Sequence, residues 1–170
     1  LVIAVRSPGL DNFITSALET LGGKSPGIML TRNIKQNYLS RLAVLGSQPG
    51  IKPLGPIGNF DAGECSIRPA LLKVDAGSWL ENAQLAQEVF GPAAIIVETT
   101  SESQMLAVAR NLKGQLTATI HAIDDQIAWS ADLVGILERR VGRIILNGFP
   151  TGVEVCDAMF HGGPYPATTD

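Results

Sequence analysis

Apolar residues are distributed along the 170-residue chain in two alternating patterns. Continuous apolar runs occur at residues 1–5 and 93–97, and such runs are typical of strands buried on both faces of a sheet. Residues 67–74, "IRPALLKV", also predict a strand. Between these runs, apolar side chains recur every three or four positions, which indicates amphipathic helices. The pattern therefore predicts strands and helices that alternate along the chain.

Two helices of the N-terminal half have recognisable boundaries. The first begins at Ser7 and Pro8 and ends at the glycine pair 22–23, and the second begins at Thr31 and ends at Gly46. The Gly- and Pro-rich stretch 47–63 predicts a loop, and residues 78–88 are compatible with a short helix. The last third predicts a strand at 93–97, a helix from Ser101 to Gly114, a strand at 116–121, a helix from Asp124 or Asp125 to Gly142, and a strand at 143–147.

Strands joined by helices at this spacing require crossover connections and therefore a parallel sheet. The predicted fold class is α/β, a three-layer αβα arrangement with a mostly parallel sheet. In such sheets ligands bind beyond the carboxyl ends of the strands. Asn147 lies at one predicted strand end, and a long glycine-rich segment follows it.

Composition limits the classes of partner and site. The net charge of −3 argues against a nucleic-acid or anionic membrane surface, and no apolar run approaches the length of a membrane helix. Two cysteines, Cys65 and Cys156, are too few for a disulfide framework, which favours a reducing cytoplasm. His121 and His161 lack partners at metal-ligand spacing, so no metal site is expected.

The segment from Glu88 to Pro92, "EVFGP", has two interpretations. In the structural one, Gly91 and Pro92 only turn the chain into the next strand. In the functional one, Glu88 accepts hydrogen bonds from the hydroxyls of a ligand and Phe90 forms an aromatic wall. An ionised carboxylate suits vicinal hydroxyls because it can accept two donors at once.

Five segments, in the same order, resemble motifs of the aldehyde dehydrogenase superfamily. "EVFGP" is similar to the E-x-F-G-P motif, and the others follow the same family pattern. They are "RPALL" at 68–72, "GQLTA" at 114–118, "GRIILNG" at 142–148 and "HGG" at 161–163. The likeness covers residues 1–170, and "GQLTATIH", "GFPTGVEV" and "HGGPYPA" are closest to 2,5-dioxopentanoate (α-ketoglutarate semialdehyde) dehydrogenases.

The resemblance implies a role for each matching residue. Glu88 would hold the nicotinamide ribose of NAD or NADP, and Phe90 would lie beside the nicotinamide. The residues expected near the aldehyde are Asn147, Phe149, Val153 and His161. For Asn147 a purely structural hydrogen-bonding role at the strand end is an equal alternative, and His121 is expected to be a packed or rim residue. The implied reaction oxidises a small aldehyde to a carboxylate. A cysteine thiolate attacks the carbonyl, a hydride passes to the nicotinamide, and a water activated by a glutamate hydrolyses the thioester.

Two residues imitate the family's catalytic groups. Glu19, near "LGGKSP", is one residue out of register with the general-base motif, and Cys65 lacks the pattern that precedes the nucleophile. The nucleophile, the base and the dinucleotide fold are therefore expected before residue 1. Residues 1–170 would be part of a catalytic domain, inactive alone and prone to form homo-oligomers through exposed apolar surface.

The alternatives to an aldehyde dehydrogenase belong to two other classes of function. A non-catalytic α/β binding or scaffold module of the same fold remains the alternative. A self-contained hydrolase is disfavoured because no G-x-S-x-G elbow occurs and neither histidine has a plausible nucleophilic partner.

Overall fold

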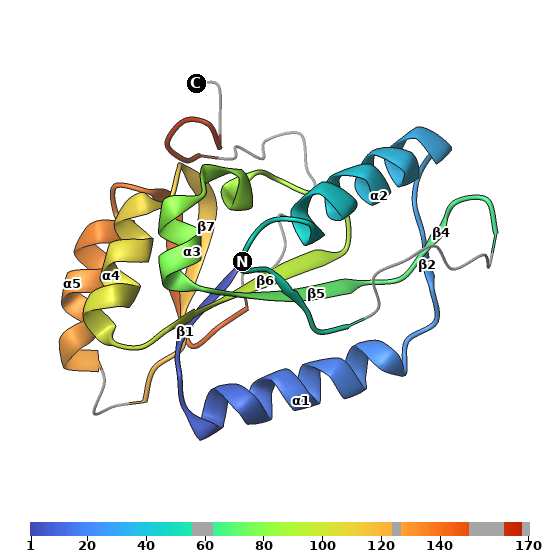
Figure 1. Cartoon of the computed structure of the whole chain (residues 1–170). Helices are drawn as coiled ribbons and strands as arrows, with labels where there is room; N and C mark the ends of the chain where they lie inside the picture. Colours follow the sequence, from blue (N-terminus) through green and yellow to red (C-terminus); the bar gives the residue numbers. More distant parts are fainter. Residues whose placement is uncertain (56–62, 124–126, 150–161, 168–170) are drawn as a thin grey trace. The chain divides into compact units, whose positions relative to one another are not determined.

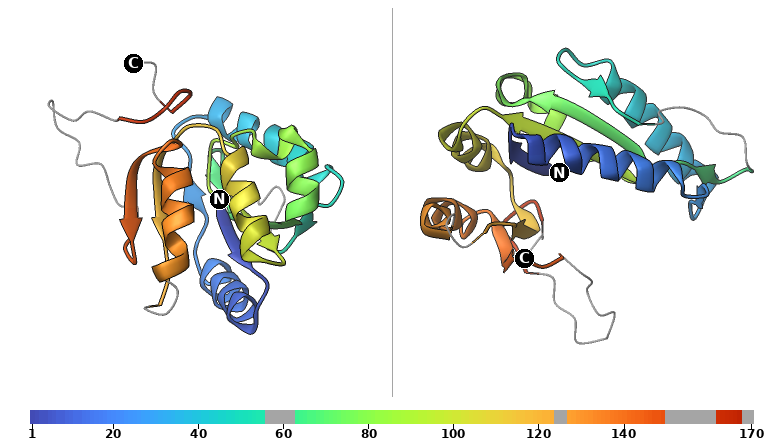
Figure 2. Two further views of the ribbon diagram at one scale, coloured as in Figure 1. Left: turned by 90° about the vertical axis from the view of Figure 1, so that its left-hand side faces the viewer. Right: turned by 90° about the horizontal axis from the view of Figure 1, so that it is seen from below.

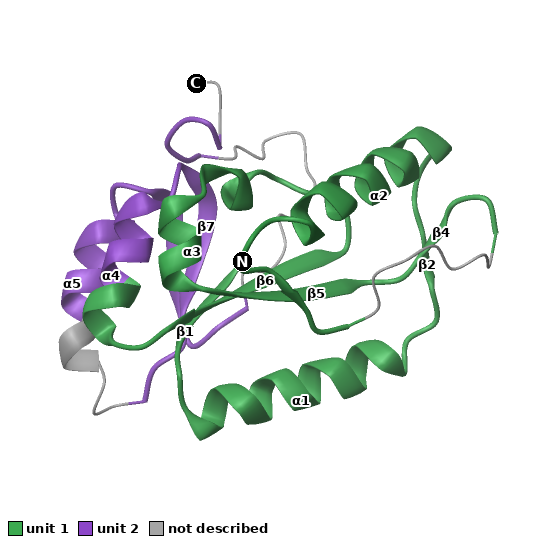
Figure 3. Ribbon diagram, in the orientation of Figure 1, with its two compact units in different colours: residues 1–105 green, residues 106–170 purple. Residues whose placement is uncertain are grey.

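A computed structural model of the chain describes residues 1–55, 63–123, 127–149 and 162–167. These residues form two compact units, unit 1 (Leu1–Met105) and unit 2 (Leu106–Asp170) (Figure 3). Among the described residues, no helix combines the length and apolarity needed to cross a membrane.

Unit 1 is built on a four-stranded sheet with the strand order β1-β6-β5-β3 (Figure 1). Strands β1, β6 and β5 are parallel, and β3 pairs with β5 in the antiparallel direction at the edge. The strands are β1 (Val2–Val5), β3 (Lys52–Pro53), β5 (Ala70–Asp75) and β6 (Ala93–Thr99). The mainly parallel sheet that the sequence predicts is confirmed.

Helices cover both faces of this sheet. Helix α1 lies along one face, and α2 and α3 lie on the other, so unit 1 has three layers (Figures 1 and 2). The helices are α1 (Pro8–Gly22), α2 (Arg32–Gly46), α3 (Ala76–Glu81) and the single 3₁₀ turn η1 (Ala83–Ala86).

The start signals of the first two long helices act as expected. Ser7 Oγ accepts a hydrogen bond of 3.2 Å from the Leu10 N–H, and Pro8 occupies the first helical position. Thr31 Oγ1 accepts a bond of 3.2 Å from the Ile34 N–H. Each side chain satisfies a helical N–H that has no partner within the helix. The predicted boundaries of both helices are therefore confirmed.

The core of unit 1 follows the two-residue period of its strands. Leu10 of α1 packs against Leu71 of β5 and Ile96 of β6, which face the same side of the sheet. Their neighbours Leu72 and Val97 face the opposite side, and both are 0% exposed. Alternate side chains are buried on both faces because helices cover both faces.

Two predictions for the middle of the chain are wrong. The predicted loop 47–63 contains strand β3, and the predicted strand 67–74 is two strands. These are β4 (Ser66–Ile67), which pairs with β2 (Gly27–Ile28), and β5, which begins after Pro69. Pro69 has no N–H to donate to a ladder, so the pairing changes partner at this point.

Unit 2 contains a parallel pair of strands, β7 and β8. Helix α4 (Glu102–Asn111) crosses the unit boundary, and β7 (Gln115–Ile120), α5 (Ile127–Leu137) and β8 (Val141–Leu146) follow. The predicted helix end at Gly142 is wrong, because Gly142 lies inside β8. A Cβ there would overlap the Gly162 backbone, so close approach of two backbones explains this glycine. The predicted strand 93–97 is β6, which pairs with β1 and β5 rather than with β7. Asp124 and Asp125, the predicted start signals of the helix before β8, lie outside the described residues.

Candidate functional site

The segment Glu88–Pro92 forms a turn at the amino end of β6. Gly91 has φ +150°, a backbone conformation that side chains disfavour, and its carbonyl accepts a bond of 2.8 Å from the Ala93 N–H. The Pro92 carbonyl accepts a bond of 2.9 Å from the Ala70 N–H at the start of β5. The turn is therefore attached to two adjacent strands through its backbone.

Tyr38 of α2 packs against this turn and forms a hydrogen bond to it. Its side chain is only 1% exposed, and its hydroxyl donates to the Pro92 carbonyl at 3.2 Å. Burial raises the pKa of Tyr38 to about 12, so the hydroxyl remains a donor at neutral pH. The ring occupies the space that a Cβ at position 91 would need. Glycine at 91 and tyrosine at 38 therefore determine the turn together.

The two predicted cofactor-binding residues point outward from this supported turn. Phe90 is 67% exposed, and Glu88 is exposed with no hydrogen-bond or ion-pair partner among the described residues. Glu88 borders a depression of about 20 Å³, shared with Arg41 and Val89. That volume is of the order needed for one water molecule, so a nucleotide sugar would have to lie on the surface beside Glu88. The carboxylate is available to a ligand on its outer side.

Asn147 lies at the carboxyl end of a strand, as predicted. That strand is β8, in unit 2. Asn147 has a φ of +50°, which asparagine tolerates better than most residues. Its Oδ1 accepts from the Ala122 N–H, and its Nδ2 donates to the Ala122 carbonyl, both at 2.9 Å. The backbone N–H of Asn147 also donates to the Ile120 carbonyl at 2.9 Å. The side chain thus joins the segments that leave β7 and β8.

The remaining predicted substrate residues are only partly described. Phe149 is 80% exposed, and its ring meets His121 edge to face with centroids 6.5 Å apart. His121 is exposed, which agrees with a rim histidine. Val153 and His161 lie outside the described residues. The two residues that imitate catalytic groups lie on different elements, since Glu19 is exposed on α1 and Cys65 directly precedes β4.

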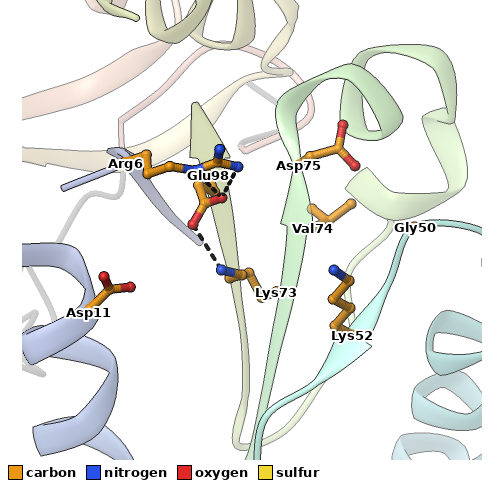
Figure 4. A pocket seen from close by; sticks show the side chains of 8 residues that line it. All are labelled: Arg6, Asp11, Gly50, Lys52, Lys73, Val74, Asp75 and Glu98. Carbon is orange, nitrogen blue, oxygen red and sulfur yellow. Dashed lines mark hydrogen bonds and ion pairs between the residues drawn. The ribbon is translucent and has the colours of Figure 1, made fainter. Parts of the chain in front are cut away.

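Sequence reasoning missed a cluster of charges at the carboxyl ends of β5 and β6, the ends opposite to the Glu88 turn (Figure 4). Glu98 of β6 is 7% exposed. Its Oε1 accepts from Arg6 Nε at 2.9 Å and from Arg6 Nη2 at 2.6 Å, while its Oε2 accepts from Lys73 Nζ at 2.8 Å. The signal in the sequence was a charged residue within each of two apolar strands, but only the strand register brings the charges together.

The hydrogen bond from Lys73, assisted by Arg6, lowers the pKa of Glu98 below its usual value of 4.5, although burial opposes the shift. Because the pKa in the folded state is depressed, the stabilisation is fully present above pH 4.5. It is lost as the pH falls through the lowered value. The charged groups that line the same cavity are Arg6, Asp11, Lys52, Lys73 and Asp75.

We expect Glu98→Gln to lower the free energy of unfolding by about 2 kcal/mol at pH 7, because two cations lose a charged acceptor. The difference from wild type should shrink as the pH falls from 4.5 through the lowered pKa of Glu98, because the folded wild-type carboxylate becomes protonated there. Urea unfolding at pH 7, 5, 4 and 3 measures both quantities. A difference that stayed constant over this range would contradict the role assigned to the Glu98 charge.

Curated proteins similar to this chain match it over its whole length. No family model matches the sequence. The chain is 41% identical over all of its 170 residues to alpha-ketoglutaric semialdehyde dehydrogenase 2 of Azospirillum brasilense, of which it covers 32%. It is 38% identical over its whole length to alpha-ketoglutaric semialdehyde dehydrogenase of Acinetobacter baylyi, again covering 32%. The chain therefore spans about a third of the length of the curated relatives it matches.

The fold has solved counterparts as well. The structure of delta-pyrroline-5-carboxylate dehydrogenase from Mycobacterium tuberculosis bound with NAD matches with a TM-score of 0.70. The match covers 99% of this chain and 32% of that chain at 17% identity, which establishes a common fold. The chain is thus similar to part of these aldehyde dehydrogenases, in sequence over all of its 170 residues and in fold over 99% of them.

Proposed function

We propose that this chain supplies part of the cofactor site and part of the aldehyde site of an NAD(P)-dependent aldehyde dehydrogenase. The observation that carries the proposal is the 41% identity to an alpha-ketoglutaric semialdehyde dehydrogenase across every residue of the chain. The proposed substrate is accordingly that semialdehyde, 2,5-dioxopentanoate, and the proposed reaction oxidises its aldehyde group to a carboxylate.

In the proposed cofactor site, Glu88 accepts hydrogen bonds from the two hydroxyls of the nicotinamide ribose. The residues present fit this role because the carboxylate is exposed and has no partner among the described residues. Tyr38 and Gly91 hold the turn, so little conformational freedom is lost when Glu88 binds. Phe90 would cover one side of the nicotinamide with its exposed ring. When bound, the nicotinamide supplies the hydride acceptor, while the protein supplies placement.

In the proposed aldehyde site, Asn147, Phe149, Val153 and His161 lie near the substrate. The bonds to Ala122 use one hydrogen of the Asn147 amide and one lone pair of its oxygen. One N–H donor and one lone pair remain for a ligand. Any contact of Asn147 with substrate would therefore come from an amide whose orientation is already fixed.

The rest of the catalytic machinery is proposed to come from outside residues 1–170. Neither Cys65 nor Glu19 is assigned a catalytic role, so we expect the chain alone to produce no aldehyde-dependent NADH or NADPH. We further propose a cytoplasmic location and a homo-oligomeric state. Exposed apolar side chains support self-association, and light scattering of the purified chain measures it. They include Leu1 at 57%, Ile28 at 86% and Leu30 at 89% exposed.

A chimera tests the proposed function. The aligned segment of the Azospirillum relative is replaced with residues 1–170, and aldehyde-dependent reduction of NAD and NADP is assayed. We expect an active chimera, and Glu88→Gln should lower kcat/KM for the cofactor by about 10- to 150-fold, because hydrogen bonds to a charged acceptor contribute about 1.5–3 kcal/mol.

Glu81→Gln is the matched control, because Glu81 is an exposed glutamate at the end of α3. A folded chimera without activity would favour the non-catalytic module. An active chimera in which both substitutions had the same effect would remove Glu88 from the cofactor site. Circular dichroism distinguishes either result from loss of folding.

A further inference from the structure

A cavity of unit 1 lies at the carboxyl ends of β1, β5 and β6, the opposite ends of the strands from the Glu88 turn. Its volume is about 350 Å³, within the range of small-molecule sites. Carboxyl ends of parallel strands are where open α/β sheets bind ligands. Six charged side chains line it, namely Arg6, Asp11, Lys52, Lys73, Asp75 and Glu98 (Figure 4).

Most of these charges are already paired. Glu98 accepts from both Arg6 and Lys73. Both oxygens of Asp75 are engaged at the start of α3, with Ser78 N–H at 3.0 Å and Ser78 Oγ at 2.7 Å. Lys52, by contrast, has no hydrogen-bond or ion-pair partner among the described residues.

Lys52 also lies beside a second lysine in the sheet. In the antiparallel pair of β3 and β5, Lys52 is directly opposite Lys73. Like charges at directly opposite positions destabilise a sheet unless an anion lies between or beside them. Glu98 compensates Lys73 from the side of β6, and no described side chain compensates Lys52 (Figure 4).

Unused donors outnumber unused acceptors around the cavity. Lys73 donates one of its three hydrogens to Glu98, and Arg6 uses Nε and Nη2 and leaves Nη1. Lys52 has three hydrogens free. The carboxylate oxygens of Asp11 have no hydrogen-bond or ion-pair partner among the described residues. Asp11 belongs to α1 rather than to the strand pair that carries the two lysines.

We propose that this cavity binds a small oxyanion, a carboxylate or a phosphate group, between Lys52 and Lys73, with Arg6 as a third donor. An oxyanion accepts several N–H donors at once and separates the two ammonium groups. Glu98 holds Lys73 and Arg6 in place, and Asp11 limits the space for a second negative group. This site is independent of the proposed dehydrogenase chemistry.

Titration of the ¹⁵N-labelled chain at low ionic strength tests the proposal, with inorganic phosphate and succinate as separate probes and sodium chloride at matched ionic strength as reference. We expect saturable shifts of amides at the carboxyl ends of β5 and β6 and in β3. Lys52→Met should weaken binding about tenfold, since one charged hydrogen bond is lost. Lys52→Arg, which keeps the charge and the donors, should retain it.

Lys24→Met is the control, because Lys24 is also an exposed lysine and lies in the turn after α1, outside the cavity. A response to phosphate alone assigns the site to phosphate compounds, and a response to succinate alone assigns it to carboxylates. Shifts no larger than those caused by chloride would overturn the proposal, as would equal weakening by Lys52→Met and Lys24→Met.

Discussion

Gly91→Ala is expected to lower the free energy of unfolding by about 3–5 kcal/mol, because it combines backbone strain with overpacking. The φ of +150° at Gly91 is unfavourable for any residue with a Cβ. That Cβ would also overlap the ring of Tyr38, which is 1% exposed and cannot turn away without moving α2. Urea unfolding of the chain, with amide exchange in β6 as a readout confined to unit 1, measures the loss.

Gly22→Ala is the matched control for this substitution. Gly22 is the last residue of α1, and a Cβ there would meet nothing within 4 Å. Alanine should therefore be neutral or stabilising by up to about 1 kcal/mol.

The double variant Tyr38→Ala/Gly91→Ala separates the two causes. Removal of the ring removes the overlap but not the strain, so the cost of Gly91→Ala should fall to about 1–3 kcal/mol in that background. An unchanged cost would show that the ring contributes nothing to the requirement for glycine. The support that Tyr38 gives to the turn carrying Glu88 would then lose its basis.

Ile96→Ala is expected to lower the free energy of unfolding by about 3 kcal/mol, through lost burial and the cavity that remains. Ile96 is 0% exposed, and it packs with Leu10 and Leu71 between α1 and the sheet. The closely packed strand on either side limits how far the cavity can collapse. Increased amide exchange in β5 and β6, together with urea unfolding, measures the effect.

Ile28→Ala provides the same chemical change without burial. Ile28 is 86% exposed in the short strand β2, so its truncation should change stability by less than about 0.5 kcal/mol. If the two variants lost similar stability, the core assigned between α1 and the sheet would be wrong.

Local signals were sufficient for most elements of this chain. Ser7 with Pro8, and Thr31, start helices through contacts within three residues of themselves, so their effect can be read along the sequence. The errors occurred where a more distant contact overrode the local pattern. The predicted strand 67–74 is divided at Pro69, because β4 pairs with β2. Gly142 lies in a strand because β8 pairs with β7, and the close approach of the Gly162 backbone explains why this strand position is a glycine.

The candidate site, too, was only partly predictable from the sequence. The motif from Glu88 to Pro92 indicated the turn and the family resemblance, and relatives with the predicted semialdehyde dehydrogenase name match the whole chain. Tyr38, which supports this turn, is 54 residues from Pro92 in the sequence. Nothing near the motif therefore indicated its role.

The order of strands and helices, the helix starts and the family likeness were determined by the sequence itself, because each depends on neighbouring residues or on a continuous motif. The ion cluster around Glu98 was decided only by the tertiary structure. Arg6 is 92 residues from Glu98 and Lys73 is 25 residues from it. A two-residue period assigns each side chain to a face of the sheet, but only the pairing register decides which charges on that face meet.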